Sequence, residues 1–185
     1  MKKILCIAVL LGSTMLASCS GISTYEDDEV AAIVNNHEIT IGDLRFLYPD
    51  DAALNYLDSA IQVELIKQEV KEMDLDISAQ LTGEKNHDDF EKLPPENTKD
   101  DGSKQVRAYA IAQAKKLDMS PEEFQTQYAK KINEQNAYIN AYLEEKLGSG
   151  DISDLEWMEE FGEDYMNLVE KLVEKNENDI TVFMK

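Results

Sequence analysis

One short stretch, residues 29–48, limits the folds open to this chain more than any other. It begins with an apolar, partly β-branched run at 30–34, which is typical of a strand. Asn35 and Asn36 follow, and asparagine tolerates the left-handed backbone that a tight two-residue turn requires. Polar and apolar residues then alternate over 37–41. The stretch therefore predicts a small β-hairpin.

The predicted hairpin leads directly into a helix. Thr40 is a good N-cap residue, and Asp43 lies three positions later, close to the spacing of a capping box. Pro49 disfavours helical backbone at Tyr48, so we expect the helix to end there. The apolar face of this helix begins with Leu44, Phe46 and Leu47.

Apolar periodicity predicts that most of the remaining chain is helical. Ser120 and Pro121 supply an N-cap and a first-turn proline, and Ser153 with Glu156 has the spacing of a capping box. We expect a mobile loop at about 82–103, where glycine and proline interrupt the pattern. Helices are predicted over 51–73, 104–117, 121–147 and 154–175, and a strand over 180–184. The predicted class is mainly α, with a small β-hairpin joined by a C-terminal strand.

The first 18 residues have the pattern of a secretory signal peptide, with two lysines, an apolar run and then small residues. They end in Leu16-Ala17-Ser18-Cys19, which is similar to the lipobox of bacterial lipoproteins. That resemblance implies that Cys19 is acylated on sulfur, for example with palmitate, and becomes the new N-terminus. Ordinary signal cleavage beside an incidental cysteine is the alternative. Residues 19–28 are polar and acidic and are predicted to form a flexible tether.

Charge and cysteine content exclude several classes of function. The full chain has a formal net charge of −20, which becomes −22 when Lys2 and Lys3 leave with the signal. Such a surface repels nucleic acid and anionic lipid head groups. Cys19 would then be the only cysteine, so we expect no intramolecular disulfide and no thiolate metal cluster. We also predict no cofactor, no metal site and no catalytic residues, because no HExxH, CxxC, GxSxG or glycine-rich phosphate motif occurs.

The order of these elements resembles the N-terminal domain of SurA/PrsA-type extracytoplasmic folding factors. Val34, Asn35, Ile39, Thr40 and Leu44 match the opening of that domain, although Asn36 stands where the family usually has glycine. The sequences at 65–78 and 114–124 are also similar to the family. The parvulin isomerase domain of such proteins is replaced here by residues 148–151. The resemblance therefore implies a SurA N-terminal-like domain over 29–185 without an isomerase.

The resemblance implies a chaperone-like role rather than an enzyme activity. The expected partners are unfolded or exported polypeptide segments, and the lipid anchor is the expected contact with the membrane. The expected location is the cell membrane, facing away from the cytoplasm, or the outer membrane where the cell has two membranes. The alternative is an envelope lipoprotein that binds a small ligand or acts as a structural partner in a complex.

The last predicted helix carries the candidate peptide-binding residues, which form an apolar arc at helical spacing. Two interpretations stay open: the arc lines a client-binding groove, or it belongs to the core. Leu155 is expected in a neighbouring stripe that serves the core, and Gly162 suggests a close approach of another backbone. The arc comprises Trp157, Met158, Phe161, Tyr165 and Met166.

Overall fold

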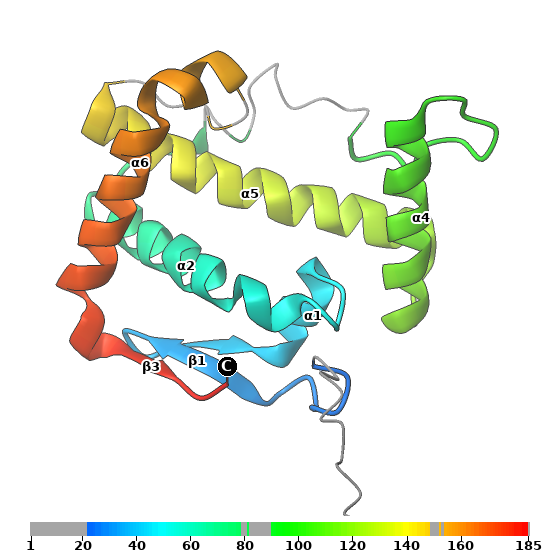
Figure 1. Cartoon of the computed structure of the whole chain (residues 1–185), viewed down its shortest axis with the longest axis horizontal. Helices are drawn as coiled ribbons and strands as arrows, with labels where there is room; N and C mark the ends of the chain where they lie inside the picture. The colour runs from blue at the N-terminus through cyan, green and yellow to red at the C-terminus, as the bar shows by residue number, and fades with distance from the viewer. Residues whose placement is uncertain (1–21, 79–80, 82–89, 149–151, 153, 185) are drawn as a thin grey trace, which may run out of the picture.

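The computed structural model describes residues 22–78, 81, 90–148, 152 and 154–184 (Figure 1). The predicted signal peptide and Cys19 lie outside these residues. The class is mainly α with a small antiparallel sheet, as the sequence predicts. The elements in chain order are β1 (Val30–Val34), β2 (His37–Thr40), α1 (Ile41–Leu47), a 3₁₀ turn (Ala53–Tyr56), α2 (Leu57–Glu72), α4 (Asp101–Lys116), α5 (Pro121–Leu147), α6 (Leu155–Lys175), a second 3₁₀ turn (Glu177–Asp179) and β3 (Ile180–Val182).

The two ends of the described chain meet in one sheet of order β2-β1-β3. Asn35 and Asn36 adopt φ angles of 48° and 66°, which are the left-handed values that the hairpin turn needs. Strand β3 pairs antiparallel with the other side of β1, with Ile33 opposite Thr181. A hairpin alone is marginally stable, and this third strand gives the sheet a second pairing. The predicted C-terminal strand is therefore confirmed.

Local caps determine where the helices begin and end. Thr40 and Asp43 form the capping box of α1, and Tyr48 is the residue that ends it. Ser120 caps α5, which starts at Pro121 as predicted. The N-cap of α6 is Asp154, whose carboxylate accepts hydrogen bonds from two first-turn N–H groups. The predicted cap at 153 lies outside the described residues.

The predicted helix over 51–73 is divided in two. Backbone bonds of the i→i+3 type, from Ala52 to Pro49 and from Asn55 to Ala52, tighten the chain before α2 begins at Leu57. Helix α2 then runs between the sheet and α5, with α6 crossing both (Figure 1). Glu69 on α2 binds Lys146 of α5 and Lys175 of α6, at 3.9 and 3.0 Å. The buried side chains of α2 form the centre of the main core: Leu57, Ile61, Leu65, Ile66 and Val70.

The acidic tether predicted for 19–28 is wrong over its described part, because residues 22–28 are docked on the domain. The side chain of Ile22 is fully buried, and its N–H donates to the Asp50 carbonyl at 2.8 Å. The Gly42 N–H donates to the Asp27 carbonyl at 2.9 Å, and a Cβ on Gly42 would lie only 3.0 Å from that oxygen. The acidic composition suggested solvation, whereas these backbone contacts come from distant residues.

The loop predicted for about 82–103 is also wrong at its C-terminal end. Helix α4 begins at Asp101, because the Asp100 carboxylate accepts the Ser103 N–H at 2.7 Å. Residues 90–100 are held by side chains from two helices. Gln125 donates to the Phe90 carbonyl at 2.7 Å, and Arg107 donates to the carbonyl of residue 94 at 2.8 Å. Residues 82–89 lie outside the described part of the chain.

Over the described residues, the structure contains no helix that is both long enough and apolar enough to span a membrane.

Candidate functional site

The predicted arc on α6 faces the core more than it faces solvent. Trp157 is only 9% exposed and stacks on Phe161, with ring centroids 5.5 Å apart. Phe161, Met158 and Tyr165 are half-buried and pack against the main core. Burial raises the pKa of the Tyr165 hydroxyl. The structure therefore assigns Trp157 to the core and leaves a partly open edge.

The remaining arc residue and its expected neighbour point away from the core. Met166 is 60% exposed, and Leu155 is 82% exposed. The expectation that Leu155 serves the core is wrong, because the side chain of this first residue of α6 is open to solvent. Met166 is thus the most open member of the predicted site.

No other backbone of the described residues approaches Gly162 closely, contrary to the expectation. A Cβ built there would meet only the terminal methyl of Met158 at 3.6 Å, which is an ordinary contact. We predict that Gly162→Ala raises the free energy of unfolding by about 0.5–1 kcal/mol, because alanine restricts the unfolded chain and favours helix. Denaturant unfolding of both proteins checks this. A loss of stability would show that the helix surface at this position is in tighter contact than the structure has it.

A second set of aromatic side chains gathers where α1, α4 and α5 meet, and the sequence analysis did not single it out. Phe124 is fully buried at its centre, and the ring centroid of Tyr128 lies 5.4 Å from that of Phe124. Three further rings have centroids within 6.4 Å of one or both of these two. Beside them, Tyr48 and Tyr56 stack face to face at 4.3 Å. We call these residues the junction cluster: Phe46, Tyr48, Tyr56, Phe90, Tyr109, Phe124 and Tyr128.

The junction cluster has a closed inner side and an open rim. Tyr56 is 44% exposed and Phe90 is 37% exposed, whereas Tyr109 and Tyr128 are half-buried. Burial raises the pKa of the Tyr109, Tyr128 and Tyr48 hydroxyls, and neighbouring tyrosines add to the rise at Tyr109 and Tyr48. These three half-buried tyrosines therefore stay neutral, and the rim beside them presents the aromatic rings of Tyr56 and Phe90.

Helix α4 is attached to this junction by hydrogen bonds to the C-terminal end of α1. Gln113 is only 4% exposed, and its Nε2 donates to the carbonyl oxygens of Arg45 and Tyr48 at 3.1 Å each. The Tyr109 hydroxyl donates to the Leu47 carbonyl. The last carbonyls of a helix have no partner within the helix, so α4 satisfies groups that would otherwise be left without one. These bonds position the Tyr109 ring of α4 against the rings of α5.

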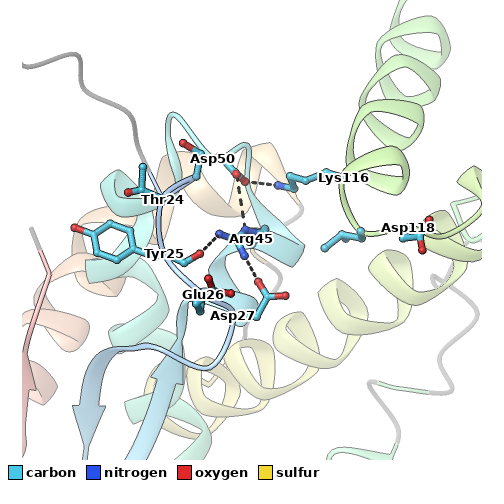
Figure 2. Close-up of a pocket in the computed structure, with 10 residues that line it drawn as sticks. Thr24, Tyr25, Glu26, Asp27, Arg45, Asp50, Lys116 and Asp118 are labelled. Atoms are coloured by element: carbon cyan, nitrogen blue, oxygen red, sulfur yellow. Dashed lines mark hydrogen bonds and ion pairs between the residues drawn. The ribbon is translucent and has the colours of Figure 1, made fainter.

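An open cavity of about 530 Å³ lies next to the junction, between residues 23–27, α1 and the end of α4 (Figure 2). The two cationic side chains that line it, Arg45 and Lys116, are both paired with carboxylates of the protein. Arg45 pairs with Asp27, and its Nε lies 3.7 Å from Asp50. Lys116 Nζ lies 2.7 Å from the same Asp50 carboxylate. The two cations thus hold the N-terminal segment to α1 and residue 50 to α4, rather than pointing toward a ligand.

The described residues contain no group of His, Cys, Asp or Glu side chains arranged to hold a metal ion.

The junction cluster could not be predicted from the sequence because its rings come from segments up to about eighty residues apart, from Phe46 to Tyr128. The available signal was the number of tyrosines on the predicted helices.

Comparison with models of known protein families, with curated proteins and with solved structures finds no match.

Proposed function

We propose that this chain is a membrane-anchored, extracytoplasmic chaperone-like protein that binds unfolded or exported polypeptide segments and has no isomerase activity. The lipobox-like sequence ending at Cys19 supports the anchor and the location. The resemblance to SurA/PrsA-type domains supports the class of client. The observation that carries the proposal is the junction cluster, which is the surface where such a segment would bind.

The rim of the junction cluster suits an unfolded chain because its rings offer area without demanding one sequence. Tyrosine and phenylalanine supply large, rigid contact surfaces at a low cost in side-chain entropy. Tyr56 and Phe90 are the most exposed members, and each packs against a less exposed ring, Tyr48 and Tyr128 respectively. An apolar client side chain could therefore add to an existing core and displace little ordered structure.

The acidic surface adds a preference among clients. With a formal net charge of −20, the chain attracts segments that carry lysine or arginine beside their apolar residues. It disfavours acidic segments and nucleic acid for the same reason. We expect binding to weaken as salt rises if this attraction contributes, because screening shortens the range of charge interactions.

The geometry favours this function over the small-ligand alternative. A small-ligand site is concave and directs a few polar groups toward one point. The described cavity is open, and Arg45 and Lys116 are paired with carboxylates of the protein itself. A structural role within an envelope complex would instead give one folded partner at fixed stoichiometry, and the experiment below distinguishes that result.

The test is a double variant at the rim, Tyr56→Ala with Phe90→Ala. We expect it to lose most of its ability to suppress the aggregation of an unfolded exported protein, measured by light scattering. Its melting temperature should fall little, since both residues are partly exposed. The matched control is Ile111→Ala with Leu155→Ala, which removes exposed apolar side chains outside the cluster. Suppression that is equal in both variants would contradict the proposed site.

The open edge of the α6 arc is the competing surface. Met166→Ala removes its most exposed residue and should leave suppression unchanged if the junction cluster binds the client. A loss confined to Met166→Ala would move the binding site to α6 while keeping the function.

A further inference from the structure

The N-terminal segment connects the predicted anchor to the domain by a very short length of chain. Ile22 is fully buried in the main core, and only residues 20 and 21 separate it from Cys19. The Cα atoms of Cys19 and Ile22 can therefore be at most about 11 Å apart, since an extended chain spans about 3.6 Å per residue. A compact domain of this length is roughly 40 Å across, so such a connection restricts how it can turn.

The segment that follows Ile22 is fixed strongly enough to carry this restraint. The Arg45 guanidinium donates to the carbonyls of Ile22 and Tyr25, at 2.8 and 2.7 Å, and pairs with Asp27 (Figure 2). The backbone bonds from Gly42 and to residue 50 add to it. The attachment point is thus part of the folded domain.

The attachment point lies on one side of a layered molecule. In Figure 1 the sheet, α2 and α5 follow one another from bottom to top, and the dark blue start of the described chain lies at the bottom, near the sheet. The C-terminal end of β3 lies on the same side, where Val182 and the residue after the strand, Phe183, are apolar and exposed, at 37% and 58%. The C-terminal end of α5 lies on the opposite side.

We infer that the sheet side of the domain, including Val182 and Phe183, faces the lipid surface, and that α5 and the first half of α6 face away from it. This orientation rests on the proposed anchoring at Cys19. The surface that faces the sheet side is a phospholipid bilayer, because the chain between Cys19 and Ile22 is too short to let this side rotate away from the anchor. Attraction to anionic head groups does not explain this orientation, because residues 26–29 are acidic and such head groups repel them.

The test uses the mature lipoprotein in phosphatidylcholine vesicles that contain an acceptor dye on a fraction of the head groups. Acylation blocks the Cys19 thiol, so a single introduced cysteine takes the donor dye. Thr181→Cys places it on the exposed surface of β3, and Glu145→Cys places it on exposed α5. We expect several-fold higher energy transfer from position 181, because α2 and α5 place position 145 about 20 Å farther from the lipid.

A flexible glycine-serine insert of about twenty residues between Ser20 and Gly21 is the second arm, since it lets the domain move by about 25 Å. The insert should remove most of the difference between the two positions. Equal transfer from both positions in the native-length protein would overturn the orientation while leaving the anchor in place. A difference that survives the insert would overturn the role of the short connection. Cys19→Ala protein that still sediments with membranes would overturn the anchor, and with it the orientation.

Discussion

Replacing Trp157 with alanine is expected to lower the free energy of unfolding by about 3–5 kcal/mol, the usual cost of truncating a buried aromatic residue. Trp157 is 9% exposed and belongs to the main core, where it stacks on Phe161. Its removal leaves a cavity that α6 can only partly close. Urea unfolding of the variant and the parent, compared at equal m-values, measures the loss.

Leu155→Ala on the same helix is the matched control. Leu155 is 82% exposed, so its truncation should change the free energy of unfolding by no more than about 0.5 kcal/mol. A similarly small change for Trp157→Ala, accompanied by loss of client binding, would restore the interpretation of the α6 arc as an open groove.

Gln113→Leu is the second substitution with a large expected effect. Leucine keeps the approximate volume of the side chain but removes the donor that reaches the carbonyls of Arg45 and Tyr48. The Tyr48 carbonyl keeps its bond from Lys116 Nζ at 3.1 Å, so the Arg45 carbonyl is the one that loses its donor. A buried acceptor left without a partner costs about 1–3 kcal/mol, and we expect a loss of that size. We also expect weaker client binding, because α4 carries Tyr109 into the junction cluster.

The control for this substitution is Gln105→Leu, an exposed position on the same helix. It should leave both stability and client binding close to those of the parent. If Gln113→Leu unfolds like the control, the attachment of α4 depends on apolar packing of Ala110 and Ala114 rather than on the capping of α1.

Local features of the sequence were sufficient to predict the hairpin, the C-terminal strand and most helix ends. Asn35 and Asn36 indicate a turn because few other residues adopt positive φ at low cost. Ser120 and Pro121 mark the start of α5 because both act within one turn of the chain. These signals depend on the neighbouring residues alone, which is why they survive folding unchanged.

Contacts between distant residues account for what the sequence could not predict. Ile22 lies in a polar, acidic stretch of sequence, and only folding buries its side chain and brings its N–H to the Asp50 carbonyl. Phe90 lies in a region that the sequence predicts to be a loop, whereas the structure holds its carbonyl by a hydrogen bond from Gln125. The junction cluster combines both difficulties, since its rings come from distant segments and contact one another only after folding, as Phe46 does with Phe124 and Phe90 with Tyr128.

Site-specific photo-cross-linking at Tyr56 tests the central claim most directly. A photoreactive phenylalanine analogue replaces Tyr56 in the membrane-anchored protein, with Leu155 as the control position, since both residues are exposed. Each protein is irradiated with one purified exported polypeptide, supplied either unfolded or folded. The account predicts a cross-linked product at Tyr56 with the unfolded form, and little with the folded form or at Leu155. Equal products at both positions, or a product with the folded form alone, would contradict it.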